Sequence, residues 1–191
     1  EYPDGKVNKL IEKDLEVKKN TIFINYNGDM EYNYENRILL QAIKHVLDIR
    51  YTEKVREEEG GTYGVGTSVS TSEYPDQEFA LNINFDCDPA NAEKLKAIIY
   101  SEIADMIKNG PSETDLNKAK ENFIKNRENS LKENRFWLNS IVFNLKHDEN
   151  ILDHDKYNEM VNSLTVDQVK EAANKYLTQG NIVEIIMTPT N

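Results

Sequence analysis

Cysteine is almost absent from this 191-residue chain. A single residue, Cys87, excludes an internal disulfide, so noncovalent packing has to hold the fold together. No apolar run approaches the roughly 20 residues that a membrane-spanning helix needs. Basic side chains are also scarce, because 23 Lys and Arg against 34 Asp and Glu give a formal net charge of -11. A surface of that sign repels phosphate groups and anionic lipid, which argues against a nucleic-acid-binding protein.

What the chain does contain is typical of a globular protein. Hydrophobic residues make up 38% and charged residues 30%, over a length that suits one sizeable domain. The chain begins with Glu1 rather than Met, which we interpret as a processed product or a segment of a longer protein. We expect a soluble protein, and the sequence leaves its compartment open between cytoplasm and periplasm.

Hydrophobic periodicity predicts an α+β fold. Residues 1–14 are charged and contain Pro3 and Gly5, which predicts a linker or N-terminal arm before a single domain over 15–191. Segment 136–145 is apolar enough to predict a buried helix. Because strands and helices are partly segregated, we expect a mostly antiparallel sheet packed against helices. The other elements are predicted in chain order as a strand at 21–26, a long helix at 32–58, a hairpin of strands at 63–71 and 79–87, helices that start near 89, 112 and 165, and a strand at 182–187.

Candidate metal ligands are few. The inverted zinc motif of peptidases is H-x-x-E-H, and His45 is followed by Val-Leu-Asp instead. His147 and His154 lie seven residues apart in an acidic stretch, which favours an exposed loop over a metal site. The sequence therefore predicts no metal site in this segment.

Nucleophile motifs are missing as well. Cys87 falls on the apolar face of a predicted strand, and the neighbouring Asp86 and Asp88 should raise its pKa and blunt its reactivity. The chain has neither a G-x-S-x-G elbow nor a phosphate-binding P-loop. These absences argue against a hydrolase or nucleotide-binding protein of those classes.

The most informative segment joins the long helix to the hairpin. Arg56 ends the helix, Gly60 stops it, and Tyr63 begins the next strand. A guanidinium and a phenol placed side by side can donate several hydrogen bonds to a carbonyl oxygen or an oxyanion. The alternative is a solvated Arg favoured by the helix dipole, next to a Tyr that only packs. Spacing alone leaves both interpretations open.

A family resemblance rests on this segment and on two later ones. Arg56, Glu57, Gly60 and Tyr63 resemble the signature in the second half of pitrilysin/insulinase zinc peptidases, which are inverzincins. Gly61 departs from that pattern, where a larger apolar residue is commoner. The residues Pro111 to Lys120 and Ser163 to Val169 are similar to helix starts of the same family, so that the resemblance covers most of the chain.

The resemblance implies a metallopeptidase half-domain, similar to those of the mitochondrial processing peptidase. In such proteins one half holds zinc through H-x-x-E-H, and the other contributes an Arg and a Tyr to a shared chamber. This chain would be the zinc-free half and inactive alone, with no cofactor of its own and zinc in a partner domain of the same chain or of another subunit.

The implied site is formed by Arg56 and Tyr63. Both would bind the backbone of an extended peptide substrate, and Tyr63 would also steady the tetrahedral intermediate. The peptide would pair with a sheet edge provided by strand 63–71 or by the final strand. Two alternatives stay open, namely a catalytically inactive structural or interaction domain of a related processing complex, and an unrelated α+β binding domain.

Overall fold

A computed structural model describes residues 3–59, 64–147 and 154–190, without the side chains of 56–59, 147 and 154. The chain divides into two compact units, where the sequence suggested one domain over 15–191. Unit 1 comprises residues 1–111 and 166–191, and unit 2 comprises residues 112–165.

Unit 1 is built on one five-stranded sheet with the strand order β1-β5-β2-β4-β3. Strand β1 runs parallel to β5, and the other three neighbouring pairs are antiparallel. The predicted α+β class with a mostly antiparallel sheet is confirmed. The strands are β1 (Lys6–Lys13), β2 (Asn20–Asp29), β3 (Gly66–Ser72), β4 (Glu78–Cys87) and β5 (Asn181–Pro189).

Strand β1 corrects the prediction of a linker or arm over residues 1–14. Its residues pair with β5 from Lys6 opposite Ile182 to Lys13 opposite Pro189. Most of its side chains are exposed, so its sequence lacks the apolar alternation by which a half-buried strand is recognised. An edge strand can form without a buried face if one neighbouring strand is hydrogen-bonded to it. For β1 that neighbour is β5, which comes from the far end of the chain.

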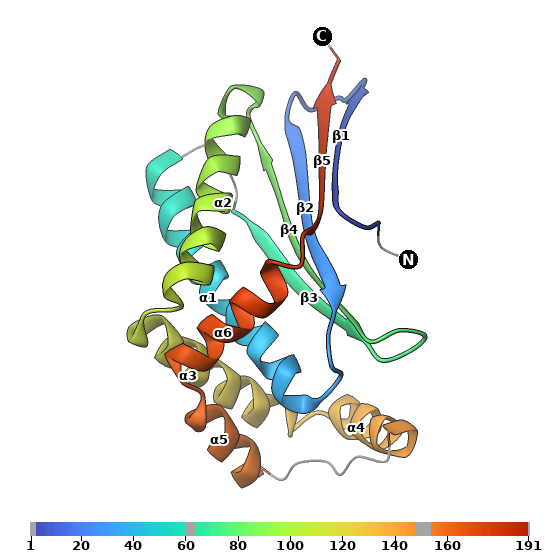
Figure 1. The fold of residues 1–191 in the computed structure, drawn as a ribbon, viewed down its shortest axis with the longest axis vertical. Helices are drawn as coiled ribbons and strands as arrows, with labels where there is room; N and C mark the ends of the chain where they lie inside the picture. The colour runs from blue at the N-terminus through green and yellow to red at the C-terminus, as the bar shows by residue number, and fades with distance from the viewer. Residues whose placement is uncertain (1–2, 60–63, 148–153, 191) are drawn as a thin grey trace. The chain divides into compact units, whose positions relative to one another are not determined.

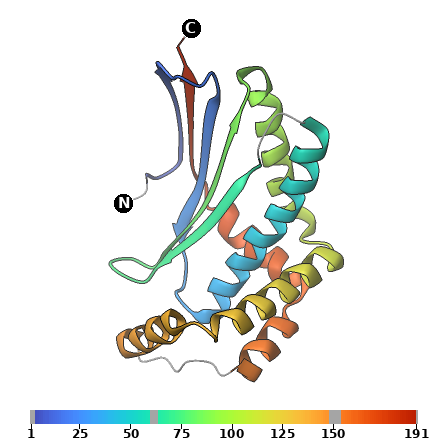
Figure 2. The same ribbon diagram turned by 180° about the vertical axis from the view of Figure 1, so that it is seen from behind.

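Helices cover one face of this sheet (Figures 1 and 2). The predicted long helix is a single element, α1, of 26 residues. Gly110 caps the C-terminus of α2, and its backbone N–H donates a hydrogen bond to the carbonyl of Met106. The elements are α1 (Tyr34–Glu59), the short 3-10 helix η1 (Pro89–Asn91), α2 (Ala92–Asn109) and α6 (Val166–Leu177).

The core of unit 1 lies between the sheet and these helices. Alternate residues of β4 point into it, and the side chains from Phe79 to Cys87 on that face are at most 3% exposed. This confirms the predicted strand at 79–87 and the apolar face on which Cys87 was placed. Further buried side chains come from β2, α1, α2 and α6, among them Ile22, Ile24, Ile43, Leu47, Leu95, Ile99, Val169 and Tyr176.

Unit 2 consists of three helices, α3 (Glu113–Ser130), α4 (Asn134–His147) and α5 (His154–Ser163). The Ser112 hydroxyl accepts a hydrogen bond from the backbone N–H of Asp115 at 3.0 Å and so caps α3. Helix α3 packs against α5, where the Lys120 Nζ donates to the carbonyl of Asn162 at 3.0 Å.

Helix α4 contradicts the prediction of a buried helix over 136–145. Trp137 is 44% exposed and Leu145 is 84% exposed, with Leu138, Ile141 and Val142 also exposed. Apolar residues on several sides of a helix usually mean burial. The sequence of α4 does not reveal whether another segment covers its apolar side chains, and this is why the prediction of burial was wrong.

Candidate functional site

The predicted site residues lie at a junction that the structure describes in part. Arg56 belongs to the end of α1, but its side chain lies outside the described residues, as does Tyr63. Their predicted roles therefore stay predictions. The structure does describe the polar contacts on both sides of this junction. We call them the framework: the contacts of Arg50 and Lys54 in α1 before the junction, and that of Thr67 in β3 after it.

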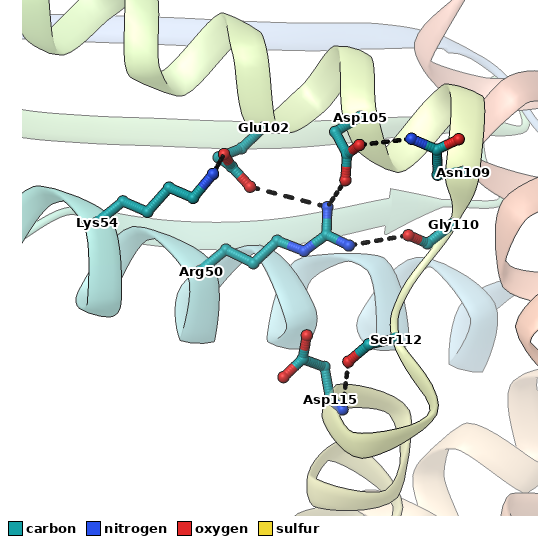
Figure 3. Close-up of polar contacts among 8 residues, drawn as sticks. All are labelled: Arg50, Lys54, Glu102, Asp105, Asn109, Gly110, Ser112 and Asp115. Atoms are coloured by element: carbon teal, nitrogen blue, oxygen red, sulfur yellow. Dashed lines mark hydrogen bonds and ion pairs between the residues drawn. The ribbon is translucent and has the colours of Figure 1, made fainter.

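On the α1 side, Arg50 is tied to α2 and to the turn that follows it (Figure 3). Its Nη1 donates to Asp105 Oδ2 at 2.9 Å, and its Nη2 donates to the carbonyl of Gly110 at 2.8 Å. Asp105 Oδ1 in turn accepts a hydrogen bond from Asn109 Nδ2 at 2.6 Å. A planar guanidinium that contacts two groups in this way fixes both the distance and the rotation of α1 against α2.

One turn closer to Arg56, Lys54 forms a charge-assisted hydrogen bond with Glu102 of α2. Glu102 is buried, at 3% exposure, and its other oxygen lies 3.8 Å from Arg50 Nη1. The hydrogen bond to Glu102 is the main cause that raises the pKa of Lys54. Two cations of α1 therefore converge on one buried carboxylate of α2 (Figure 3).

On the β3 side, the Thr67 hydroxyl donates a hydrogen bond to Asp48 Oδ1 of α1. The other oxygen of Asp48 pairs with Lys44 at 2.6 Å. Thr67 is the second residue of β3, so this contact holds the beginning of the strand against the helix. The segment that carries Arg56 and Tyr63 is therefore held on both sides by polar contacts.

Two other titratable groups of α1 lie near this framework. Burial raises the pKa of the Tyr51 phenol well above its ordinary value, so this core side chain stays neutral. Burial also lowers the pKa of His45, and Asp48 opposes that effect. At neutral pH both shifts favour the neutral side chain, so neither group adds a charge next to the ion pairs of Arg50 and Lys54.

No set of metal ligands is found in the part of the chain that the structure describes. Within it, no group of three or more His, Cys, Asp or Glu side chains is placed to hold an ion. The backbone of His147 ends α4 and that of His154 begins α5, although both were predicted in a loop. In the same described residues, no helix combines the length and the apolar character that a membrane crossing requires.

Cys87 is buried at the end of β4. Burial, and then the charges of Asp88 and Asp86, raise the pKa of its thiol to about 11. The sequence pointed to the two carboxylates, but desolvation is the larger cause. The thiol is therefore protonated at neutral pH and is no candidate nucleophile.

The raised pKa of Cys87 predicts a loss of stability in alkali. Between pH 9 and 11 the unfolded chain loses the thiol proton and the folded chain keeps it, so the free energy of unfolding should fall as pH rises. The full effect of this shift is roughly 3 kcal/mol. Urea denaturation at pH 8 and at pH 11 measures it.

A Cys87→Ala variant isolates this effect, because Tyr26 also has a pKa raised to about 12 by burial and adds a loss of the same sign. The variant should lose less stability than the wild type over the same pH range. Equal losses in both proteins would mean that the thiol does not contribute.

The sequence missed the residues that build this framework. It predicted the helices that carry Arg50, Lys54, Glu102 and Asp105 but assigned these residues no role. A signal was present, since Arg50 and Lys54 are four apart on one predicted helix, and Glu102 and Asp105 three apart on another. Only the packing of α1 against α2 shows that the two pairs face each other.

Comparison with known proteins matches residues 1–123 to the family described as the peptidase M16 inactive domain. A "Zinc protease PQQL-like" protein of Arabidopsis thaliana is 30% identical over 102 residues, which are 51% of this chain and 11% of that protein.

Two solved structures share the fold. The periplasmic protease PqqL from Escherichia coli is 19% identical with a TM-score of 0.79, over 96% of this chain and 21% of that chain. A peptidase M16 inactive domain from Pseudomonas fluorescens is 21% identical with a TM-score of 0.81, over 100% of this chain and 46% of that chain. The chain thus spans less than half the length of each of these three relatives.

Proposed function

Because the chain belongs to the family of peptidase M16 inactive domains, we propose that it is the zinc-free, substrate-binding half of a zinc endopeptidase. This is the zinc-peptidase family that the sequence motifs predicted. The observation that carries the proposal is the family match over residues 1–123, which includes the whole signature from Arg56 to Tyr63. The described residues offer no ligand set for zinc, so the metal is assigned to a partner domain with an H-x-x-E-H motif.

In this proposal Arg56 and Tyr63 face a chamber shared with the zinc-binding domain. The Arg56 guanidinium donates to backbone carbonyls of an extended peptide. The Tyr63 phenol donates to the oxyanion that develops at the scissile carbonyl. Zinc in the partner domain would polarise that carbonyl and activate water. The contacts of Arg50, Lys54 and Thr67 support this role because they hold the helix and the strand that flank the two residues.

The sheet topology supports one of the two predicted docking edges for the peptide. Strand β5 has bonded neighbours on both sides, β1 and β2, so the final strand is not an edge and that alternative is wrong. Strand β3 lies at the end of the strand order and begins three residues after Tyr63. An extended peptide added along β3 would place its carbonyls next to the segment that carries Arg56 and Tyr63.

The first test is hydrolysis of an unstructured, internally quenched peptide by the full native protein. We expect cleavage that a zinc chelator abolishes and that added zinc restores, because the proposed enzyme depends on a metal in its partner domain. If the protein cleaves no peptide even with added zinc, the alternative of a catalytically inactive interaction domain takes its place. Hydrolysis that resists the chelator would contradict the zinc mechanism itself.

A further inference from the structure

The buried carboxylate Glu102 has an unusual set of partners for a residue in a helix-to-helix contact. Two cations from one helix, Arg50 and Lys54, converge on it, and Arg50 also pairs with Asp105 at 2.9 Å (Figure 3). Only Lys54 among these cations has its side chain largely in solvent, at 53% exposure, against 11% for Arg50. The cluster therefore consists of buried Glu102 and Arg50, and of Lys54, whose side chain reaches Glu102 from the surface.

Stability alone does not account for such a cluster. Removing charges from water costs several kcal/mol per ion, and well-packed apolar residues in the same place are often as stabilising or more so. What a charged cluster adds is a defined arrangement of the two helices, because the planar guanidinium accepts few orientations towards a carboxylate and a buried carboxylate that loses a cation is left with an uncompensated charge. The geometry defined by this cluster is that of the last turns of α1 against α2.

The end of α1 needs such support. The last four carbonyl groups of a helix have no partner within the helix, and helix ends fray. In α1, which ends at Glu59, these are the carbonyls of residues 56–59, so Arg56 is the first residue of the part that tends to fray. Lys54 lies two residues before it and is the last residue of α1 with a described polar contact to another element.

We propose that Lys54 is a positioning residue, which through Glu102 fixes the end of α1 and thereby places Arg56 for binding of the peptide backbone. This inference rests on the proposed function and adds to it a residue that does not touch the substrate. Arg50 supports the same arrangement one turn earlier, and Glu102 serves as the common anchor. Loss of Lys54 leaves Glu102 paired with Arg50, so the fold should survive the change.

The test uses Lys54→Met in the full native protein. The Met side chain keeps the length of the lysine stem and removes the charge and the hydrogen bond to Glu102. We expect KM for the internally quenched peptide to rise about 10-fold with little change in kcat, because a 1 Å misplacement of a binding group can cost up to about 100-fold. The Kd of an uncleaved extended peptide, measured by fluorescence anisotropy, should rise by the same factor.

Three further variants complete the experiment. Lys54→Arg keeps a cation within reach of Glu102 and should restore most of the affinity. Lys108→Met makes the same substitution at an exposed lysine in the last turn of α2 and should change neither KM nor the Kd. Arg56→Ala is the benchmark for the proposed function and should raise KM and the Kd at least as much as Lys54→Met.

The outcomes distinguish the positioning role of Lys54 from the proposed binding role of Arg56. A raised KM for Lys54→Met, with rescue by Lys54→Arg and a melting temperature that stays well above the assay temperature, supports positioning, since a purely structural role would lower activity only by lowering the folded fraction. If Lys54→Met behaves like Lys108→Met while Arg56→Ala raises KM, the inference is wrong and the proposed function stands. If Arg56→Ala leaves KM and the Kd unchanged, the binding role of Arg56 fails and the inference fails with it.

Discussion

Replacing Tyr63 with Phe in the full native protein is expected to lower kcat/KM for an unstructured peptide by roughly 10²–10³-fold. The change removes one hydroxyl and keeps the ring, so only a hydrogen bond is lost. In the proposed site this hydroxyl donates to an oxyanion that exists in the transition state and not in the bound substrate. The loss should therefore fall on kcat, with KM nearly unchanged.

The split between kcat and KM distinguishes Tyr63 from Arg56, whose proposed contacts are with the peptide backbone in the ground state. Steady-state kinetics on one peptide measures both parameters for both variants. Tyr74→Phe is a suitable control, because Tyr74 is an exposed residue of the turn between β3 and β4 and undergoes the same chemical change. If the wild type is active and Tyr63→Phe matches this control, the domain serves as scaffold and Tyr63 has no part in catalysis.

The second large effect is expected for Gly110→Ala, which should lower the free energy of unfolding by about 3 kcal/mol. Gly110 ends α2 with φ 77° and ψ -170°, a conformation that is essentially restricted to glycine. A Cβ at this position would also lie 2.9 Å from the Cβ of Lys170 in α6. Because that atom is attached directly to the backbone of α6, the overlap can be relieved only if a helix shifts.

Urea denaturation of wild type and Gly110→Ala measures this loss. Gly180→Ala is the matched control, since Gly180 also has a positive φ of 95° but nothing lies within 4 Å of its Cβ position. The control should cost about 1–2 kcal/mol from backbone strain alone. Equal losses at both positions would show that the contact with Lys170 does not contribute.

The Gly110→Ala variant also bears on the site. The carbonyl of Gly110 accepts a hydrogen bond from Arg50, so that a shift of this turn would disturb the contacts of α1 with α2. A rise in KM that accompanies the loss of stability would be consistent with that link. Lys54→Met leaves Glu102 paired with Arg50 and does not alter the backbone of this turn, so it remains the cleaner test of positioning.

Several elements could be predicted because their information is local. Hydrophobic periodicity predicted the strand at 79–87, with Cys87 on its apolar face, and the long helix at 32–58, which is α1. Both patterns follow from the geometry of the backbone, in which side chains repeat every two residues in a strand and every 3.6 in a helix. The signature from Arg56 to Tyr63 was readable for the same reason, as a short pattern at the junction of two such elements.

Other features could not be predicted because they depend on partners far away in the chain. Lys6–Lys13 forms a strand because β5, more than 170 residues later, lies beside it. Leu145 is exposed although it lies in the segment 136–145 that was predicted to be buried, since burial requires a second segment to cover it. For both, the local sequence is compatible with more than one state.

By itself, the sequence determined the fold class, the position of most helices and strands, and the family, because these follow from local periodicity and from ordered short motifs. It also determined which residues are candidates for binding a peptide. Only the tertiary structure decided that Arg50 and Lys54 of α1 meet Glu102 of α2, and that β3 rather than β5 is an edge of the sheet. The reason is that both depend on how elements distant in sequence pack and pair, and no local pattern specifies which partner an element will have.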